Sequence, residues 1–174
     1  FKMKHTIYLA GGCFWGVQAY MEKLPGVLET EAGYANGETK NPSYEEVCGK
    51  DTGHAETVRV IYDSDILPLS LLLKAFFKVV DPTQLDRQGG DVGKQYRNGV
   101  FYVDEADKPV IEDMVAYLQT NYDKTVVTEV KALENFYPAE EYHQQYLNKT
   151  PAGYCHINLS DAEEFIRENG LNRA

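Results

Sequence analysis

The stretch Thr6-Ile7-Tyr8-Leu9-Ala10-Gly11-Gly12-Cys13-Phe14-Trp15-Gly16 contains a change from strand to helix within a few residues. Its first part, residues 6–10, is short, apolar and rich in strand-forming residue types, which predicts a β-strand. Apolar side chains then recur at positions 14, 17, 21 and 24, which is the spacing of an amphipathic helix. The two glycines between these segments allow a tight turn and a close approach of the backbone. This order predicts a strand, a turn and a helix whose first turn contains Cys13.

Cys13 is the first candidate functional residue. The free backbone N–H groups and the macrodipole at a helix N-terminus favour a thiolate over a thiol. The alternative is a buried cysteine that serves as a small apolar side chain, which is a common role of an isolated cysteine. Because the turn matches the needs of a thiolate, we predict that Cys13 is reactive.

The rest of the chain continues the alternation of strands and helices. Residues 26–34 contain strand-like stretches that lead to Asn36-Gly37, a strong turn signal, and residues 54–62 alternate as in a strand. An apolar helix is predicted over residues 69–80, where Asp81-Pro82 ends it. Shorter strands are predicted at residues 99–103 and 125–130, separated by a helix that Asp104 is expected to cap.

Turn-forming residues mark the remaining segments. Residues 38–53 and 84–98 are predicted to be loops. Tyr137-Pro138 is expected to open a short helix, and Ser160 with Glu163 forms a capping-box pattern for a last one. The resulting order predicts an α/β (α+β) fold of two layers. Its expected core is a ferredoxin-like βαββαβ unit with a mixed or antiparallel sheet, followed by extra C-terminal helices and loops.

Length and composition limit the class of protein. A chain of 174 residues suits one domain, and we expect residues 1–174 to form it. The formal net charge of -10 argues against a nucleic-acid-binding protein, which would carry a basic stripe. No apolar run approaches the roughly 20 residues that span a bilayer, so no membrane partner is expected. Three cysteines without a CxxC or CxxH pair argue against a disulfide scaffold and a zinc site.

Two polar residues, His54 and Glu56, begin the strand predicted after residue 53. Alternation places both on the face opposite Ala55. A carboxyl group there could act as a general acid if burial raised its pKa. The local pattern alone favours a strand end exposed to solvent, because charged residues are mostly exposed.

The loop at residues 88–97 is rich in glycine and contains Asp91 and Tyr96. It lacks the GxxxxGK[ST] pattern and does not join a strand to a helix, so it is a poor candidate for nucleotide binding. Asp91 and Tyr96 either line a pocket or only shape a surface loop.

Cys155 lies between a Pro-Ala-Gly segment and His156, in a loop that can change shape, as a resolving thiol requires. A structural disulfide with Cys13 and an inert, buried Cys155 remain alternatives. Cys48 has no comparable surroundings, and we interpret it as structural.

Several elements of the chain, in their order, resemble those of the peptide methionine sulfoxide reductases of type A. The resemblance covers nearly all of residues 6–157. The elements are Gly12-Cys13-Phe14-Trp15-Gly16, Gly33-Tyr34-Ala35-Asn36-Gly37, Asn41-Pro42-Ser43-Tyr44, Thr52-Gly53-His54-Ala55-Glu56, Gln95-Tyr96-Arg97 and Glu140-Glu141-Tyr142-His143-Gln144-Gln145-Tyr146.

The resemblance implies reduction of methionine S-sulfoxide, free or in proteins, by a thiol-dependent oxidoreductase of protein repair. It assigns the attack on the sulfoxide sulfur to the Cys13 thiolate and the transfer of a proton to the oxygen to Glu56. The hydroxyls of Tyr44 and Tyr96 would bind that oxygen. The resemblance thus reverses the local interpretation of Glu56 as an exposed residue and makes Tyr44 and Tyr96 site candidates.

The other implied roles concern binding and recycling. Phe14 and Trp15 would form the apolar wall around the substrate methyl group, and Asp91 and His54 become candidates for substrate binding. Cys155, in a Gly-Tyr-Cys-His element of the family, would convert the Cys13 sulfenic acid to a disulfide that a thioredoxin-type dithiol reduces.

The resemblance implies no bound cofactor or metal, only an external dithiol such as thioredoxin or dithiothreitol. The expected partners are oxidised proteins or peptides, free methionine sulfoxide and the thioredoxin-like reductant. Because the chain begins with Phe1, a fusion to a type B reductase domain stays open. A cytoplasmic location is expected, with a periplasmic or surface location as the alternative for a fusion protein.

Two rival functions remain at this stage. A cysteine hydrolase would use Cys13 with His54, His143 or His156 as base, and its activity would survive Cys155→Ser. A binding module for methionine-containing peptides would show affinity without turnover.

Overall fold

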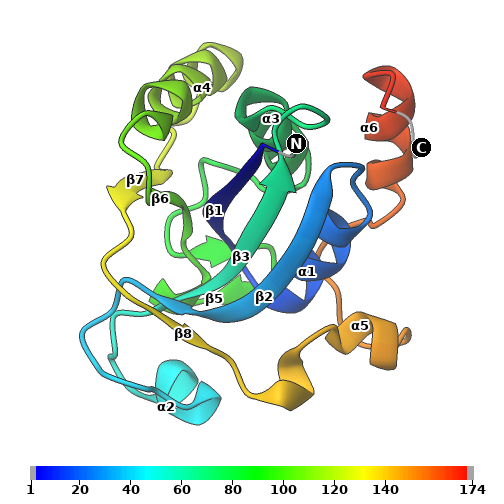
Figure 1. Ribbon diagram of the computed structural model, residues 1–174. Helices are drawn as coiled ribbons and strands as arrows, with labels where there is room; N and C mark the ends of the chain where they lie inside the picture. The colour runs from blue at the N-terminus through cyan, green and yellow to red at the C-terminus, as the bar shows by residue number, and fades with distance from the viewer. Residues whose placement is uncertain (1–2, 172–174) are drawn as a thin grey trace.

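The structure is a computed structural model that describes residues 3–171, and its centre is a mixed sheet of six strands (Figure 1). Across the sheet the strands follow in the order β7 (Glu129–Ala132), β6 (Asn98–Tyr102), β1 (Lys4–Gly11), β3 (Ala55–Asp63), β2 (Val27–Ala35) and β8 (Phe136–Pro138). All neighbouring strands are antiparallel except β6 and β7, which are parallel. The sheet is therefore mixed, as the sequence predicted.

Strands β1, β2, β3 and β6 form the ferredoxin-like core that the sequence predicted. The chain runs β1, α1 (Phe14–Glu22), β2, β3, α3 (Leu69–Val79), β6, which is the βαββαβ order. These strands lie in the order β6-β1-β3-β2, so β3 separates the two strands that α1 connects. The strands β7 and β8 extend the two edges of this core.

The hydrophobic core lies between the sheet and the helices. In Figure 1 the helices α1 and α3 lie behind the sheet, and α4 (Asp107–Asn121) and α6 (Asp161–Glu168) lie at its upper margin. Buried apolar side chains from the sheet and all four helices form one cluster, which supplies most of the stabilisation by burial. A smaller cluster covers the other face of the sheet, where Tyr8 and Phe101 lie with Leu133 and Phe136 packed against them.

Both predicted loops contain structure that periodicity did not reveal. Residues 38–53 contain α2 (Tyr44–Gly49), whose start is fixed by a capping box. The Ser43 hydroxyl accepts a hydrogen bond from the Glu46 N–H at 3.1 Å, and the Glu46 carboxylate accepts one from the Ser43 N–H at 3.0 Å. The second loop holds the hairpin of β4 (Arg87–Gln88) and β5 (Asp91–Val92) and a 3-10 turn, η1 (Lys94–Tyr96). These elements are too short for a periodic apolar pattern.

Some predicted element boundaries were wrong. Tyr137-Pro138 belongs to the edge strand β8 and opens no helix; the 3-10 turn η2 (Glu141–His143) and α5 (Tyr146–Lys149) follow it. Asp104 accepts a hydrogen bond from the Ala106 N–H at 2.9 Å but precedes α4, which begins at Asp107. Ser160 occupies the N-cap position of α6 without a side-chain capping bond.

Strand β7 begins at Glu129, later than predicted, because its parallel pairing with β6 starts there. Within residues 3–171, no helix is long and apolar enough to cross a membrane.

Candidate active site

Cys13 and Glu56 lie together beneath the first turn of α1. Cys13 is the N-cap residue of that helix, and its side chain is buried as a free thiol. Glu56 lies on β3, opposite Tyr34 of β2, and is 1% exposed. Its Oε1 atom accepts a hydrogen bond from the backbone N–H of Phe14 at 3.1 Å. The exposed strand end that local alternation favoured for Glu56 is therefore wrong, because the helix N-terminus covers this end of β3.

The protonation state of Glu56 follows from its burial. Burial raises the pKa of the carboxyl to about 8, the hydrogen bond from Phe14 acts in the opposite direction, and the Asp91 charge raises the pKa further. Glu56 is therefore mainly protonated at neutral pH. Its Oε1 atom accepts from Phe14, while Oε2 is buried without a hydrogen-bond partner among the described residues. This arrangement places the acid proton on Oε2, free to be donated.

The pKa of Cys13 differs from the expectation of a stable thiolate. Burial, followed by the Glu56 charge, raises the pKa of the thiol, although the backbone N–H of Trp15 acts to lower it. Desolvation thus outweighs the helix N-terminus in the resting protein. When Glu56 is protonated, it carries no charge that raises the pKa of Cys13. A protonated Glu56 therefore favours ionisation of the Cys13 thiol.

Tyr44 and Tyr96 approach this pair from α2 and η1. Burial and then the Glu56 charge raise the pKa of each hydroxyl, so both remain protonated donors. The charge of Cys13 also raises the pKa of both hydroxyls, so both tyrosines lie near Cys13 as well as Glu56. Asp91 lies nearby on β5 and accepts a hydrogen bond from the Tyr154 hydroxyl at 3.0 Å. The structure thus brings four of the predicted site residues to Cys13 from different elements.

Phe14 and Trp15 have different degrees of exposure. Phe14 is fully buried in the core, with its ring 5.7 Å from that of Tyr34. Trp15 is half-buried and stacks on Tyr146 at a centroid distance of 3.8 Å. Its indole N–H donates to Nδ1 of His143 at 3.0 Å, which fixes the orientation of the ring.

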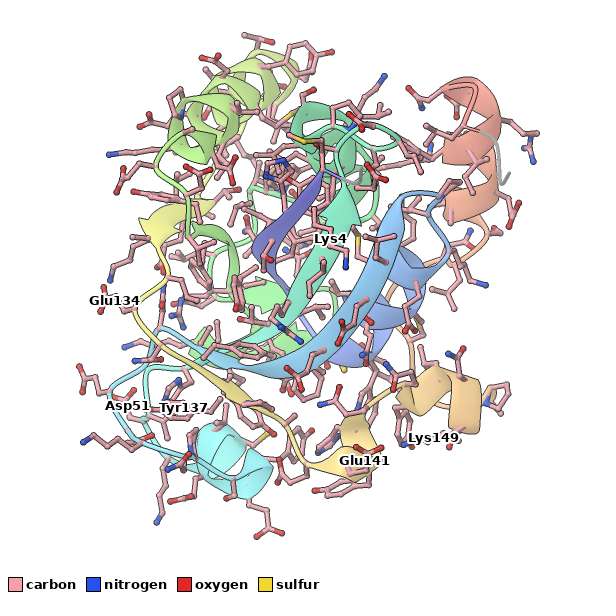
Figure 2. All side chains as sticks on the ribbon, viewed as in Figure 1. Lys4, Asp51, Glu134, Tyr137, Glu141 and Lys149 are labelled. Atoms are coloured by element: carbon pink, nitrogen blue, oxygen red, sulfur yellow. The ribbon has the colours of Figure 1, made fainter. Side chains whose placement is uncertain are left out.

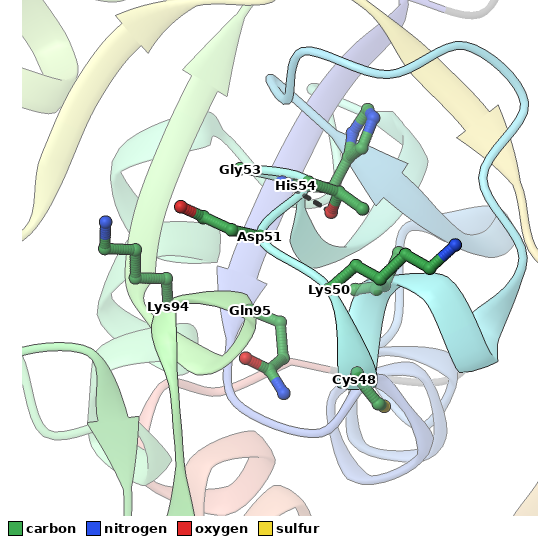
Figure 3. A pocket seen from close by; sticks show the side chains of 10 residues that line it. Cys48, Lys50, Asp51, Gly53, His54, Lys94 and Gln95 are labelled. Carbon is green, nitrogen blue, oxygen red and sulfur yellow. Dashed lines mark hydrogen bonds between the residues drawn. The ribbon is translucent and has the colours of Figure 1, made fainter.

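His54 lies apart from this group. Its Nε2 atom hydrogen-bonds with the Thr39 carbonyl at 2.7 Å, and its ring meets Tyr137 edge-on. His54 borders a hollow of about 200 Å³, but its ring points away from it (Figure 3). His54 precedes β3, and the contacts described for its ring do not join it to Cys13 or Glu56.

Cys155 lies beside Gly16, which follows Cys13 by about one turn of α1. A Cβ atom placed on Gly16 would lie only 3.2 Å from the Cys155 sulfur, so the absence of a side chain at Gly16 allows this approach. Cys155 is a free, half-buried thiol that donates a hydrogen bond to the Ile157 carbonyl at 3.1 Å. The charge of Cys155 raises the pKa of Cys13, so the two thiols lie near each other although 142 positions separate them in the sequence.

Cys48 lies closer to the site than its sequence surroundings suggested. Burial raises the pKa of its exposed thiol, whereas Tyr44, Tyr96 and Gln95 act to lower that pKa, so these side chains lie near it. Cys48 and Gln95 border the hollow shown in Figure 3, together with Lys50 and Lys94. The signal was the position of Cys48 one helical turn after Tyr44, which could not be used while residues 38–53 were interpreted as a loop.

Glu140 and His143 support the site, and both belong to the stretch at residues 140–146. The sequence does not single out Glu140, and it indicates His143 only as the base of a hydrolase. The Glu140 carboxylate accepts hydrogen bonds from the Tyr34 hydroxyl at 2.8 Å and from the Tyr44 N–H at 3.0 Å. It therefore anchors the start of α2 to the sheet. His143 is buried, its ring lies 4.4 Å from that of Tyr44, and it orients Trp15.

Glu140→Ala is expected to lower the free energy of unfolding by about 1–3 kcal/mol, because the buried Tyr34 hydroxyl loses its acceptor. Urea denaturation followed by circular dichroism measures the change. The matched control is Glu141→Ala, which removes only the exposed ion pair with Lys149 at 3.6 Å, labelled in Figure 2. That control is expected to change stability by about 0.5 kcal/mol or less. Equal losses in the two variants would refute the anchoring role of Glu140.

Among residues 3–171, no group of three or more His, Cys, Asp or Glu side chains could hold a metal ion. The chemical groups gathered here are a buried thiol, a protonated carboxyl, two phenol hydroxyls and a second thiol. Such a set can attack an electrophilic sulfur, protonate an oxygen bound to it and form a disulfide.

Comparison with known proteins points to one family. The family model described as peptide methionine sulfoxide reductase matches residues 5–173. The peptide methionine sulfoxide reductase MsrA of Lachnoclostridium phytofermentans is 56% identical over 155 residues, which cover 89% of this chain and 93% of the relative. The MsrA of Alkaliphilus metalliredigens is 55% identical over 153 residues, covering 88% of this chain and 97% of the relative.

Solved structures show the same fold. The reduced form of Mxr1 from Saccharomyces cerevisiae is 37% identical, with a TM-score of 0.85 and coverage of 89% of this chain and 91% of that chain. Methionine sulfoxide reductase A of Corynebacterium diphtheriae is 36% identical, with a TM-score of 0.77 and coverage of 87% and 77%. Mxr1 in complex with Trx2 is 26% identical, with a TM-score of 0.59 and coverage of 82% and 84%. With a family model that spans nearly the whole chain and relatives this similar, the chain belongs to the peptide methionine sulfoxide reductase family.

Proposed function

We propose that this protein reduces methionine S-sulfoxide, free or in proteins, to methionine, with Cys13 as nucleophile and Glu56 as proton donor. The activity is that of the family, and the chain is an oxidoreductase of this kind. The observation that carries the assignment of residues is the protonated Glu56 carboxyl held beside Cys13, with one oxygen on the Phe14 N–H and the other without a partner.

The first step transfers the sulfoxide oxygen to Cys13. The Cys13 sulfur attacks the electrophilic sulfur of the substrate and forms a sulfur–sulfur bond, while Glu56 donates its proton to the oxygen. The S–O bond of the substrate then breaks and the hydroxyl passes to Cys13 as the sulfur–sulfur bond breaks. The products are methionine and the Cys13 sulfenic acid, so the substrate gains two electrons and Cys13 loses two. The Cys13 thiol gives its proton to Glu56, which replaces the proton that Glu56 donated to the oxygen.

Tyr44, Tyr96, Phe14 and Trp15 bind the substrate in this proposal. The two hydroxyls donate hydrogen bonds to the sulfoxide oxygen, where negative charge develops. The exposed part of Trp15, held by His143 and Tyr146, contacts the methyl group, and Phe14 completes the apolar wall behind it. Asp91 acts through its charge, which raises the pKa of Glu56 and keeps the acid protonated.

The second step uses Cys155 to form a disulfide with Cys13, and a thioredoxin-type dithiol then reduces it. The nearness of the two thiols over Gly16 supports the first part. The solved complex of the relative Mxr1 with Trx2 supports the second. The cycle needs no bound cofactor, only thioredoxin or dithiothreitol. A type B reductase, fused or separate, would act on the other sulfoxide epimer.

We treat residues 1–174 as one catalytic domain, since a single core joins the sheet to α1, α3, α4 and α6. Dependence on a thioredoxin-type reductant implies a reducing compartment such as the cytoplasm.

The test is a single turnover without reductant. One equivalent of methionine S-sulfoxide is expected to yield one methionine and to remove two of the three free thiols, with the link mapped to Cys13 and Cys155 by mass spectrometry. The R epimer is the control and should leave all three thiols free. Unchanged thiols and unconsumed S-sulfoxide would refute the proposed function.

The hydrolase alternative gains no support from the described contacts. The rings of His54, His143 and His156 hydrogen-bond with Thr39, Trp15 and Gly11 respectively, and the titratable group whose charge acts most on Cys13 is Glu56.

A further inference from the structure

His156 lies over the same point of α1 as Cys155. A Cβ atom placed on Gly16 would lie 3.3 Å from His156 Nδ1 and 3.2 Å from the Cys155 sulfur. A Cβ atom on Gly12 would lie 3.0 Å from the other ring nitrogen, Nε2. The imidazole therefore spans the glycine turn that holds Cys13 and the helical turn that Cys155 approaches.

The hydrogen bond of His156 determines which ring nitrogen is basic. Nε2 lies 2.9 Å from the Gly11 carbonyl oxygen, and because a carbonyl only accepts, Nε2 carries the proton. Nδ1 then has a free lone pair. It is buried and has no hydrogen-bond partner among the described residues. A buried acceptor without a partner costs stability, so its persistence needs a reason outside packing.

The surroundings of His156 suit a base that is neutral at rest. Burial lowers the pKa of the ring, whereas the hydrogen bond to Gly11 and the Asp91 charge raise it. The titratable group whose charge acts on the His156 ring is Asp91, which accepts a hydrogen bond from the Tyr154 hydroxyl, and the Cys155 thiol lies over the same glycine. The Asp91 charge would stabilise the imidazolium when the ring accepts a proton.

We propose that Nδ1 of His156 relays the proton of the resolving step, from the Cys155 thiol to the hydroxyl that leaves Cys13. This inference rests on the proposed function, in which Cys13 becomes a sulfenic acid and Cys155 attacks it. The Cys155 S–H bond breaks toward Nδ1, the S–S bond forms, and the S–O bond of Cys13 breaks. The relayed proton converts the leaving hydroxide to water, so Cys155 and Cys13 form a disulfide without an added oxidant.

The relay requires a small change in the Cys155 side chain. Its S–H now donates to the Ile157 carbonyl at 3.1 Å, two residues along the same loop. A rotation of the side chain toward Gly16 exchanges this weak bond for the His156 acceptor and brings the sulfur toward Cys13. Gly16 leaves the space for this movement.

The experiment separates the two chemical steps in a single turnover. Rapid quenching after addition of one equivalent of methionine S-sulfoxide gives the rate of methionine formation, and counting free thiols gives the rate of disulfide formation. His156→Gln keeps an N–H donor for the Gly11 carbonyl but lacks the basic nitrogen. It is expected to form methionine at the wild-type rate and the disulfide about 10²-fold more slowly.

A second variant distinguishes proton relay from packing. His156→Ala is expected to slow the disulfide step in the same way, and added imidazole should restore part of the rate. A cavity of about 290 Å³ bordered by Cys155 and Leu147 gives small molecules access to this loop. The control is His5→Gln on β1, which should leave both rates unchanged.

Disulfide formation at the wild-type rate in His156→Gln would overturn the proposal. So would a slow His156→Ala that imidazole does not accelerate, since that result indicates a packing role. Neither result would affect methionine formation by the wild-type protein. Failure of the wild-type protein to form methionine would instead refute the proposed function on which this inference rests.

Discussion

Glu56→Gln is expected to lower the single-turnover rate of methionine formation by about 10²–10³-fold. Glutamine keeps an acceptor for the Phe14 N–H but has no acidic proton to give to the sulfoxide oxygen. Quenched-flow measurement of methionine gives the rate. The control is Glu105→Gln, an exposed change before α4, which should leave the rate unchanged. Methionine formation at the wild-type rate in Glu56→Gln would exclude Glu56 as the acid.

The same residue predicts the pH dependence of the first step. Because the pKa of Glu56 is about 8, its protonated fraction and hence its ability to donate fall as pH rises through that value. Asp91→Asn removes a charge that raises this pKa, so the loss of activity should begin at a lower pH. A pH profile that is identical in the two proteins would show that Asp91 does not act through Glu56.

The raised pKa also affects stability. Folded Glu56 holds its proton more tightly than the unfolded chain, whose carboxyl has its ordinary value of 4.5. Stability therefore decreases as pH rises from that value through about 8, where the unfolded state has lost the proton that the folded state keeps. In Glu56→Gln, the free energy of unfolding should not show this decrease with pH. Urea denaturation at several pH values measures it.

Cys155→Ser is expected to release one methionine per protein at the wild-type rate and then to lose turnover with thioredoxin by about 10²-fold or more. Without the Cys155 thiol, Cys13 stays a sulfenic acid, which a protein dithiol that recognises a disulfide reduces poorly. A sulfenic-acid-specific probe should label Cys13 in this variant after one turnover.

Cys48→Ser is the matched control, because it changes the same atom in a thiol that lies on the other side of the site, beside Tyr44 and Tyr96. It should keep thioredoxin-dependent turnover. Full turnover in Cys155→Ser together with its loss in Cys48→Ser would assign the resolving role to Cys48.

The fold was largely predictable because its signals are local. The apolar strand before Gly11, the helical spacing after Cys13 and the alternation at residues 54–62 each depend on neighbours in the chain. The errors occurred where elements are short. α2 is recognised by its capping box and not by periodicity, and Tyr137-Pro138 is a strand only because Gly33 and Tyr34 of β2 pair with it.

The environments in the site were less predictable. The position of Cys13 at a helix N-terminus follows from the sequence, but the direction of its pKa shift does not, because burial and the Glu56 charge outweigh the helix. Glu56 is a similar case: its local pattern indicates an exposed strand end, whereas α1 covers it. The position of Cys48 near the site was not predicted for the same reason, since Tyr96 lies 48 positions from it.

The sequence by itself determined the order of the elements, the place of Cys13 at a strand-to-helix turn and, through its ordered motifs, the family. The tertiary structure alone decided which side chains share one low-dielectric centre, that Glu56 is protonated, that Cys155 and His156 lie over Gly16, and that His54 stays apart. The physical reason is that desolvation and charge act through space with steep dependence on distance and burial. Residues such as Cys13 and Cys155, separated by 142 positions, acquire these interactions only when the sheet and α1 bring them together.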